Sequence, residues 1–229
     1  MQGKVVLITG ANGGLGVAVT EAFLKAGATV AASARSIKAA DFPQPMFHAF
    51  PAELSGSAAA NALVAAVLAR LGRIDAVVHL MGGFAGGAPV QETDDATLEK
   101  MLDMNLRSSF HLFRAALPSM RAQGSGRIVA IGSRAAVEPS AGIAAYSLSK
   151  AALVSLIRNL ALENKNSGVT ANIILPGTMD TPTNRASMPG ADFARWVQPE
   201  QVANLLLTLV ADASSNISGA VIPIYGGDL

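Results

Sequence analysis

Residues 9–16 read TGANGGLG, between the apolar run Val5-Val6-Leu7-Ile8 and an alanine-rich segment with a helical pattern that extends to Gly27. Glycine is favoured where a backbone turns left-handed or comes very close to another group. A strand that passes through such a turn into a helix points unpaired N–H groups at the gap, and these groups attract an anion. The stretch therefore predicts a dinucleotide site or a tight strand-to-helix connection, and its context must distinguish the two.

Short β-branched segments alternate with longer helical patterns along the whole chain. The expected strands are KVVLITG, TVAASAR, MFHAF, IDAVVHLMG, GRIVAIGS, VTANIILPG and ISGAVIPIYGG. Helical patterns start near Leu15 and cover about 56–71, 93–122 and 145–164, and a further short segment lies near 198–211. This alternation predicts an α/β fold, a doubly wound parallel sheet of about seven strands with helices on both faces. Ligands are then expected beyond the carboxyl ends of the strands.

The composition agrees with such a buried sheet. Hydrophobic residues make up 51% of the 229 residues and charged residues only 14%, which favours one domain over residues 1–229 without a linker. The formal net charge of +1 provides no general attraction to nucleic acid or to an anionic membrane. We therefore expect small molecules, or copies of the same chain, as partners.

Several other classes of site are disfavoured. The chain has no cysteine, which excludes disulfides and thiolate metal sites and is compatible with a reducing cytoplasm. His48, His79 and His111 have no ligand-like spacing, so we interpret them as structural or surface residues and expect no metal. No apolar stretch approaches the ~18 residues of a spanning helix, and the run after Lys4 is too short for a signal peptide. A soluble, cytoplasmic protein is expected.

Tyr146 and Lys150 lie four residues apart in AYSLSKAAL, so a helix places both side chains on one face. A free tyrosine has a pKa of about 10, and a nearby ammonium favours the phenolate and lowers that pKa. A Tyr-x-x-x-Lys pair alone is also typical of a helix surface. Ser133, at the end of the predicted strand GRIVAIGS, favours chemistry instead, because its hydroxyl could bind a substrate oxygen beside the tyrosine.

These features occur together in the order of a known superfamily. TGANGGLG, Asn105 in MLDMNLRSSF, Ser133, Tyr146 with Lys150, Pro176-Gly177 and the terminal SGAVIPIYGG make the chain resemble short-chain dehydrogenases/reductases from end to end. The resemblance implies a Rossmann-type sheet and an NAD(P)-dependent oxidoreductase that transfers hydride to or from a carbonyl or hydroxyl group of a small molecule. It also implies a homodimer or homotetramer. The helical segments 101–120 and 151–162 could pack against other copies, or cover only their own sheet.

The same resemblance implies a role for each site residue. Tyr146 would be the general acid/base, Lys150 would lower its pKa and hold the nicotinamide ribose, Ser133 would orient the substrate oxygen, and Asn105 would position a water in the proton relay. The implied cofactor contacts are Gly10, Asn12, Gly14, Leu15, Gly16, Arg35, Leu54, Met81, Gly82, Gly83, Tyr146, Lys150, Pro176, Gly177 and Thr178.

One motif departs from the superfamily pattern. Where its members usually show NNAG after the fourth strand, this chain has His79-Leu80-Met81-Gly82. The glycine is retained, and the missing asparagines indicate altered packing below the nicotinamide.

The end of the second predicted strand bears on cofactor choice. NAD-binding domains place an acidic residue there, whereas an arginine accommodates the 2′-phosphate of NADP. This chain has Ala34 followed by Arg35, with no carboxylate nearby in sequence. We therefore expect a preference for NADP(H), with NAD(H) possible; alternatively, Arg35 is only a solvated loop cation.

The segment at about 178–198 is the predicted substrate loop. Its sequence MDTPTNRASMPGADFARW and the earlier MGGFAGG resemble the corresponding stretches of quinonoid dihydropteridine reductases. Those enzymes generally lack a serine at the position of Ser133 and use NADH, so pterin reduction is an alternative to carbonyl reduction. A catalytically silent dinucleotide-binding sensor is an alternative of another class. Phe84, Gly86, Met188 and Trp196 could line a pocket or only pack, and no role is assigned to them.

Overall fold

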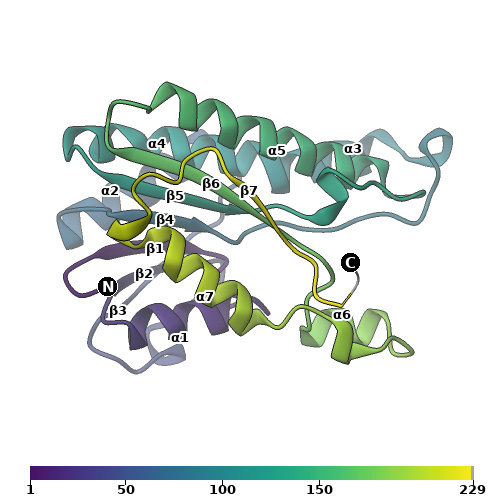
Figure 1. The fold of residues 1–229 in the computed structure, drawn as a ribbon, viewed down its shortest axis with the longest axis horizontal. Coiled ribbons are helices and arrows are strands. Elements are labelled where there is room, and N and C mark those ends of the chain that lie inside the picture. Colours follow the sequence, from purple (N-terminus) through teal and green to yellow (C-terminus); the bar gives the residue numbers. More distant parts are fainter. Residues whose placement is uncertain (228–229) are drawn as a thin grey trace.

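One parallel sheet runs through the protein, for which a computed structural model describes residues 1–227 (Figure 1). Its strands are β1 (Val5–Thr9), β2 (Thr29–Ala34), β3 (Phe47–Pro51), β4 (Ala76–His79), β5 (Gly126–Ile131), β6 (Val169–Pro176) and β7 (Val221–Ile224). The seven strands lie in the order β3-β2-β1-β4-β5-β6-β7, and each neighbouring pair is parallel. The predicted doubly wound α/β sheet is therefore confirmed.

Helices cover both faces of this sheet. They are α1 (Gly16–Lys25), α2 (Ser57–Leu71), α3 (Asp95–Leu102), α4 (Ser108–Ala122), α5 (Ala144–Glu163), α6 (Pro182–Ser187) and α7 (Pro199–Val210). Figure 1 shows α1 and α7 on one face, α2, α4 and α5 on the other, and α6 beyond the carboxyl ends of the strands. Short 3-10 turns span Ala39–Asp41, Val90–Glu92, Arg134–Ala136, Phe193–Arg195 and Asp212–Ser214. No helix within residues 1–227 is long and apolar enough to cross a membrane.

Alternate residues of the central strands feed two separate cores. In β1, Val5 and Leu7 join the core beneath α2, α4 and α5, whereas Val6 and Ile8 join the core beneath α1 and α7. Both sets are buried because helices cover both faces, so the strand appears in the sequence as a continuous apolar run. Because both faces of these strands are buried, the strands could be predicted from their apolar composition as well as from their alternation with helical segments.

Most of the predicted strands and helices extend one to three residues beyond the observed ones. The last strand was predicted too long, since only Val221–Ile224 pairs with β6. The helical region predicted over 93–122 is interrupted by a π-helical turn, Asp103–Arg107, between α3 and α4. One extra residue per turn widens the helix there, and Asn105 lies inside the widened turn. The apolar pattern of the segment does not predict this interruption.

The turn between β1 and α1 depends on close backbone contact. Gly10 has φ +72°, a left-handed conformation that favours glycine. A Cβ on Gly16 would lie 2.0 Å from the Gly10 carbonyl oxygen, a distance that no side chain can occupy. A Cβ on Gly10 would lie 3.0 Å from the Met81 backbone nitrogen, in the turn after β4. The strand ends β1 and β4 therefore meet at the point where the strand order reverses, which is the expected ligand position.

Candidate active site

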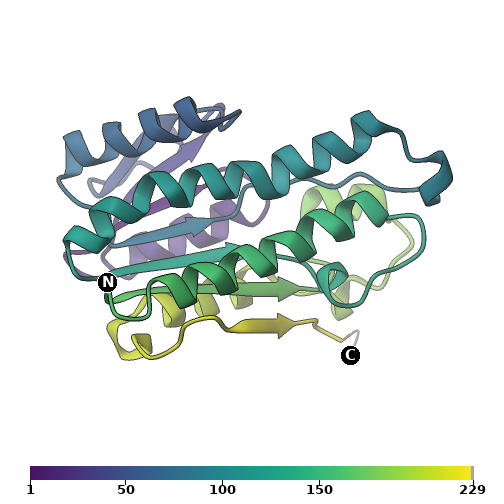
Figure 2. The same cartoon turned by 90° about the horizontal axis from the view of Figure 1, so that it is seen from above.

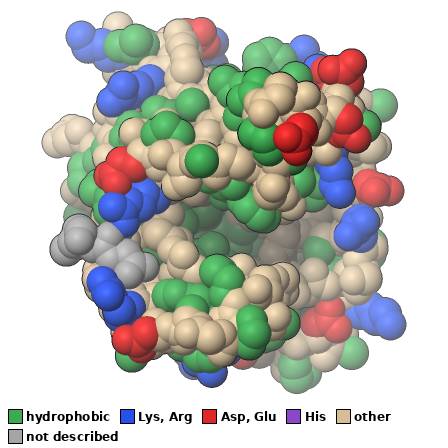
Figure 3. All heavy atoms as spheres, turned by 90° about the vertical axis from the view of Figure 1, so that its right-hand side faces the viewer, with side chains coloured by type: hydrophobic (Ala, Val, Ile, Leu, Met, Phe, Trp, Pro, Cys, Tyr) green, Lys and Arg blue, Asp and Glu red, His purple; other side chains and the backbone are tan. Residues whose placement is uncertain are grey.

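The predicted site residues come from segments that leave the carboxyl ends of the strands, at one edge of the sheet. Viewed from that end, the surface is hollowed between two lobes (Figure 3). The visible walls of the hollow are hydrophobic side chains together with backbone or uncharged polar side chains, and the Lys, Arg, Asp and Glu side chains in that view lie around its rim.

Ser133, Tyr146 and Lys150 lie together at this edge. Tyr146 and Lys150 are one turn apart on α5, with the Lys150 nitrogen 6.0 Å from the centre of the Tyr146 ring. Ser133 follows β5 and is a hydrogen-bond partner of the Tyr146 side chain. The Ser133 oxygen also accepts a bond of 3.2 Å from the Ala135 backbone N–H, which fixes its direction. The arrangement can hold a substrate oxygen between two hydroxyl groups.

The net shift of the Tyr146 pKa is upward, and the lowering expected from Lys150 stays a prediction. Burial raises the pKa of the Tyr146 phenol, and the hydrogen bond with Ser133 opposes that rise. The same burial lowers the pKa of Lys150 to about 8, because an ammonium loses hydration in the interior. Lys150 is only 5% exposed, and its nitrogen donates a 2.9 Å bond to the carbonyl oxygen of Ile131, the last residue of β5.

Asn105 connects the turn after β4 to helix α5. Its Oδ1 accepts from the Gly83 N–H at 2.9 Å, and its Nδ2 donates to the Gly83 carbonyl and to Ser149 Oγ, each at 3.0 Å. A Cβ on Gly82 would come within 2.8 Å of Asn105 Oδ1 and 3.3 Å of Lys150 Nζ. Asn105 thus lies beside Lys150, and its side-chain N–H groups are already bound to Gly83 and Ser149.

His79 replaces the first asparagine of the usual motif with a different link between strands. It pairs in register with Thr9 across β1 and β4, and its Nδ1 lies 2.7 Å from Thr9 Oγ1. Its ring also packs edge-on against Phe113, with centroids 5.5 Å apart. Complete burial, together with the positive charge of Lys150, lowers the pKa of His79 to about 3, so the imidazole is neutral. The predicted structural role is confirmed, and an apolar strand that ends in a histidine opposite a threonine is the signal for this link.

The β1–α1 turn has the features of a phosphate cradle. Among residues 1–227, the backbone N–H groups of Gly14 and Leu15 have no hydrogen-bond partner, although they lie at the start of a helix. A Cβ on Gly14 would lie 2.9 Å from Thr181, so the segment after β6 packs directly on this turn. The residues present therefore fit a dinucleotide pyrophosphate.

Arg35 is exposed directly after β2, and within residues 1–227 its guanidinium has no ion pair or hydrogen bond. Next to it, Asn12 Nδ2 donates to Ser36 Oγ at 3.3 Å, so the ends of β1 and β2 are adjacent here. A free cation at this place suits a phosphate on the adenosine ribose.

Two of the residues predicted to contact the cofactor, Leu54 and Leu15, could do so only through their backbone, because their side chains are buried. The Leu54 side chain packs in the core near Phe50 and Leu63, and that of Leu15 packs in the other core near Val19. Pro176, Gly177 and Thr178 leave the end of β6 at the same edge of the sheet, where a Cβ on Gly177 would lie 2.8 Å from the Tyr225 carbonyl oxygen.

The segment 178–198 is held together by its own side chains. Arg185 pairs with Asp180 at 2.7 Å, lowering the pKa of that carboxyl, and lies over the Phe193 ring, 4.7 Å from its centre. Phe193 in turn packs on Trp196 at 4.7 Å. Thr181 caps α6 by accepting from the Asn184 N–H. These contacts between side chains of the segment thus determine the shape of the loop.

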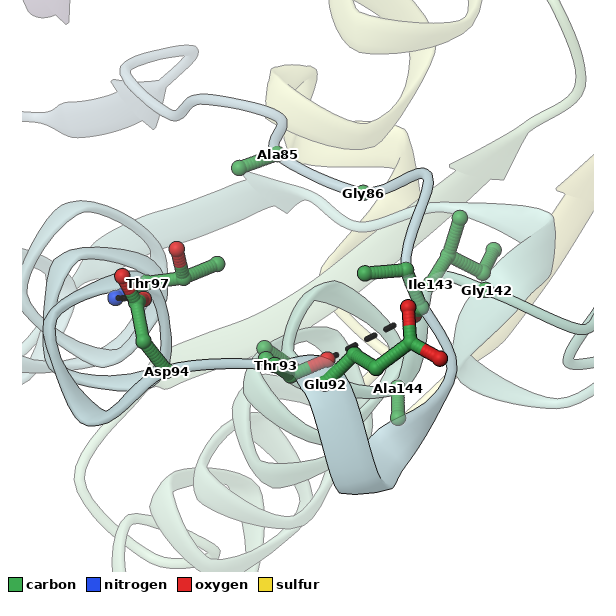
Figure 4. Close-up of a pocket in the computed structure, with 11 residues that line it drawn as sticks. Ala85, Gly86, Glu92, Thr93, Asp94, Thr97, Gly142, Ile143 and Ala144 are labelled. Carbon is green, nitrogen blue, oxygen red and sulfur yellow. Dashed lines mark hydrogen bonds between the residues drawn. The ribbon is translucent and has the colours of Figure 1, made fainter.

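The opposite lobe begins with Phe84, which follows Gly83. Behind it, a cavity of about 170 Å³ lies between the segment 85–97 and the start of α5 (Figure 4). Its lining is mostly short side chains and backbone, including Gly86, Gly142 and Ala144. Asp94 in this lining accepts from the Thr97 N–H at 2.8 Å and so caps α3. Glu92 also lies in the lining, so both charged side chains of the cavity are acidic.

Comparison with known proteins identifies the family. The profile of the short chain dehydrogenase family matches residues 4–191. A short-chain dehydrogenase/reductase of Talaromyces verruculosus is 31% identical over 246 residues, covering 98% of this chain and 96% of the relative. The 2,3-dihydro-2,3-dihydroxybenzoate dehydrogenase of Escherichia coli (strain K12) is 30% identical over 244 residues, covering 99% and 97%. A solved structure of 3-ketoacyl-(acyl-carrier-protein) reductase from Brucella melitensis, complexed with NADH, matches with a TM-score of 0.89 at 25% identity, covering 99% and 98%.

The chain therefore belongs to the short-chain dehydrogenase/reductase family, as its motifs predicted. It is an NAD(P)-dependent oxidoreductase acting on CH–OH or C=O groups.

The buried Lys150 predicts a specific pH dependence of stability. Its folded-state pKa of about 8 lies below the ordinary 10.5, so between these values the unfolded chain holds a proton that the folded chain lacks. The free energy of unfolding should therefore rise with pH, by about 2 kcal/mol from about pH 7 to about pH 9.5, relative to a Lys150→Met variant. Urea denaturation of both proteins without cofactor measures this difference. An equal difference between the two proteins at both pH values would contradict it.

Proposed function

We propose that the protein is an NADPH-dependent reductase, or dehydrogenase in the reverse direction, for a small molecule with a carbonyl or hydroxyl group. The observation that carries this proposal is the group of Ser133, Tyr146 and Lys150 beside a turn that fits a dinucleotide. We infer that the segment 178–198 is the substrate loop, because Thr181 packs on that turn at Gly14.

The proposed roles follow from the contacts. The nicotinamide, when bound, supplies a hydride to the carbonyl carbon and is itself oxidised, or accepts one from the alcohol in the reverse direction. Ser133 and Tyr146 hold the carbonyl oxygen, and the Tyr146 hydroxyl donates the proton that completes the alcohol. The ammonium of Lys150, fixed by the Ile131 carbonyl, stabilises the resulting phenolate and is placed to hold the ribose. Asn105 is better suited to bracing than to relaying protons, because its side-chain N–H groups already bind Gly83 and Ser149.

Arg35 supports the preference for NADPH. The guanidinium is exposed and has no competing carboxylate within residues 1–227, and a phosphate would provide a charge-assisted partner. The B. melitensis reductase is complexed with NADH, so membership of the family alone leaves the choice open. The proposed preference for NADPH over NADH therefore rests on Arg35.

Pterin reduction is the competing hypothesis, and the contacts in the loop argue against it. A pterin has ring nitrogens and a carbonyl that need polar partners, whereas the polar residues of the shared motif bind one another. Asp180 is paired with Arg185 and also accepts from Gln198 Nε2 at 3.2 Å. The likeness to dihydropteridine reductases is therefore explained without a pterin.

We also propose that the protein is cytoplasmic, consistent with its lack of cysteine, and that it forms a homodimer or homotetramer through α4 and α5. These helices run side by side on the outside of the sheet (Figure 2). A groove of about 530 Å³ lies between them, with Phe110, Leu117 and Leu156 in its lining. The lining also contains Arg121 and Glu163, so a two-fold contact could place opposite charges together.

Replacing Tyr146 with Phe tests the proposed chemistry. The variant loses the proton donor but keeps the ring, so turnover should fall by about 10²- to 10⁴-fold while NADPH binding is retained. Loss of NADPH absorbance with a panel of ketones, aldehydes, quinones and quinonoid dihydropterin measures this. Wild-type turnover of the dihydropterin but of no ketone, aldehyde or quinone would favour the pterin hypothesis. NADPH binding without turnover of any acceptor would favour a silent sensor, and full activity of the variant would refute the role of Tyr146.

Replacing Arg35 with Ala tests the cofactor preference. The change should weaken NADPH binding by about tenfold to a hundredfold through loss of the charged contact, and leave NADH binding unchanged. Titration of both dinucleotides, followed by fluorescence, measures the affinities. Lys38→Ala is the matched control, since Lys38 is also an exposed cation after β2. Equal affinities of the wild type for the two dinucleotides would overturn the prediction.

The oligomer is tested at Phe110, which is 44% exposed on α4 and lines the groove. A Phe110→Glu variant should have a smaller assembly than the wild type, because the change removes the apolar ring from the contact and would bury a carboxylate there. Light scattering after size-exclusion chromatography gives both masses. Val90→Glu, at a residue 72% exposed and outside the groove, should keep the wild-type mass. A monomeric wild type, or an unchanged mass of the Phe110 variant, would contradict the proposed interface.

A further inference from the structure

Phe84 is both exposed and in contact with the proposed catalytic tyrosine. Its side chain is 65% exposed, yet its ring meets the Tyr146 ring with centroids 5.0 Å apart and planes at 74°. Isolated exposed hydrophobic residues are common and need no explanation. This one differs because one side of the ring is fixed against the residue that would hold the reacting oxygen, while most of the ring is left open.

The backbone on either side of Phe84 is held in place. The preceding residue, Gly83, is bound through its N–H and its carbonyl by Asn105. Further along, the Gly87 N–H donates to the Gly142 carbonyl at 2.7 Å. Between them, a Cβ on Gly86 would lie 2.7 Å from Ile143 Cγ2 and 3.2 Å from Phe84 Cζ, so the Phe84 ring packs against this glycine. The aromatic ring is therefore presented by a braced loop, and ordering it costs little when a ligand arrives.

The polarity around Phe84 limits what can bind beside it. The walls of the hollow at this end of the molecule are hydrophobic side chains together with backbone or uncharged polar side chains, and charged side chains lie at its rim (Figure 3). The Ser133 and Tyr146 hydroxyls, which the proposed reaction uses for the carbonyl oxygen, are polar groups at the Phe84–Tyr146 contact. An anionic group on the substrate beside Phe84 would lose hydration against the electron-rich face of the ring, and Glu92 and Asp94 in the adjoining cavity would repel it.

We propose that Phe84 is a substrate-recognition residue that selects uncharged carbonyl compounds whose carbonyl is conjugated to a flat ring, that is, aryl ketones and quinones. The Phe84 ring offers offset or edge-to-face contact to such a ring while the adjoining carbonyl reaches Tyr146 and Ser133. A saturated ring of similar size would gain apolar contact with Phe84, but it has no π-system for the offset or edge-to-face contact. This inference deepens the proposed function and rests on it.

Two ketones and two variants test the inference. Acetophenone and cyclohexyl methyl ketone differ in whether the ring is flat and conjugated, and kcat/KM is measured for both with saturating NADPH. Because the two ketones differ in intrinsic reactivity, the measured quantity is the ratio of their kcat/KM values compared between proteins. Phe84→Leu keeps apolar volume but removes the aromatic ring, and Phe84→Trp keeps an aromatic surface. The acetophenone preference should fall by about twofold to twelvefold in the Leu variant and be retained in the Trp variant.

The results separate the inference from the function on which it rests. If the wild type reduces both ketones but the ratio is the same in the Leu variant, the proposed function stands and the role of Phe84 is refuted. If the wild type reduces no carbonyl compound of the wider panel, the proposed function itself fails.

Binding provides a readout that does not need turnover. In Tyr146→Phe with NADPH, saturation-transfer NMR should detect acetophenone, and the additional Phe84→Leu change should weaken that signal. An unchanged signal in the double variant would also refute the inference.

Discussion

The contact between the start of α1 and the turn after β1 is the constraint on which the site depends. With only 2.0 Å between a Cβ on Gly16 and the Gly10 carbonyl oxygen, the helix can start where it does only because no side chain is present. That start leaves N–H groups of the turn unpaired and brings Gly14 against Thr181 from the far end of the chain. Because all seven strands are parallel, the other site residues then leave the sheet at the same edge.

The buried polar groups at this edge satisfy one another only in part, since the Nε2 atom of His79 has no hydrogen-bond partner within residues 1–227. The Lys150 ammonium is buried, and the Ile131 carbonyl offsets part of the cost of its lost hydration. His79 is close enough for Lys150 to affect its pKa, and it stays neutral, so the two groups do not place two positive charges in one apolar region. At this position, where the family motif has an asparagine, the chain instead links β4 to β1 through His79 Nδ1 and Thr9 Oγ1.

Sequence reasoning succeeded where the signal is local. The strand ends and the positions of Ser133 and Arg35 could be predicted, because apolar runs and turn residues are neighbours in the sequence. The π-helical turn at Asn105 could not, since it is accompanied by bonds to Gly83 and Ser149, which lie 22 and 44 residues away. The raised pKa of Tyr146 was missed for a similar reason, because burial in the folded chain outweighs the hydrogen bond with Ser133.

The loop after β6 shows why similarity of a motif and similarity of a substrate need separate evidence. Arg185, Phe193 and Trp196 form a stack, and Asp180 holds the charged end of it, so these side chains are needed for the shape of the loop whatever is bound beside it. A chain can therefore keep the motif while its substrate changes. We therefore assign substrate selectivity to a residue whose side chain is not needed for the shape of this loop. Phe84 is such a residue, because most of its ring is exposed beside Tyr146.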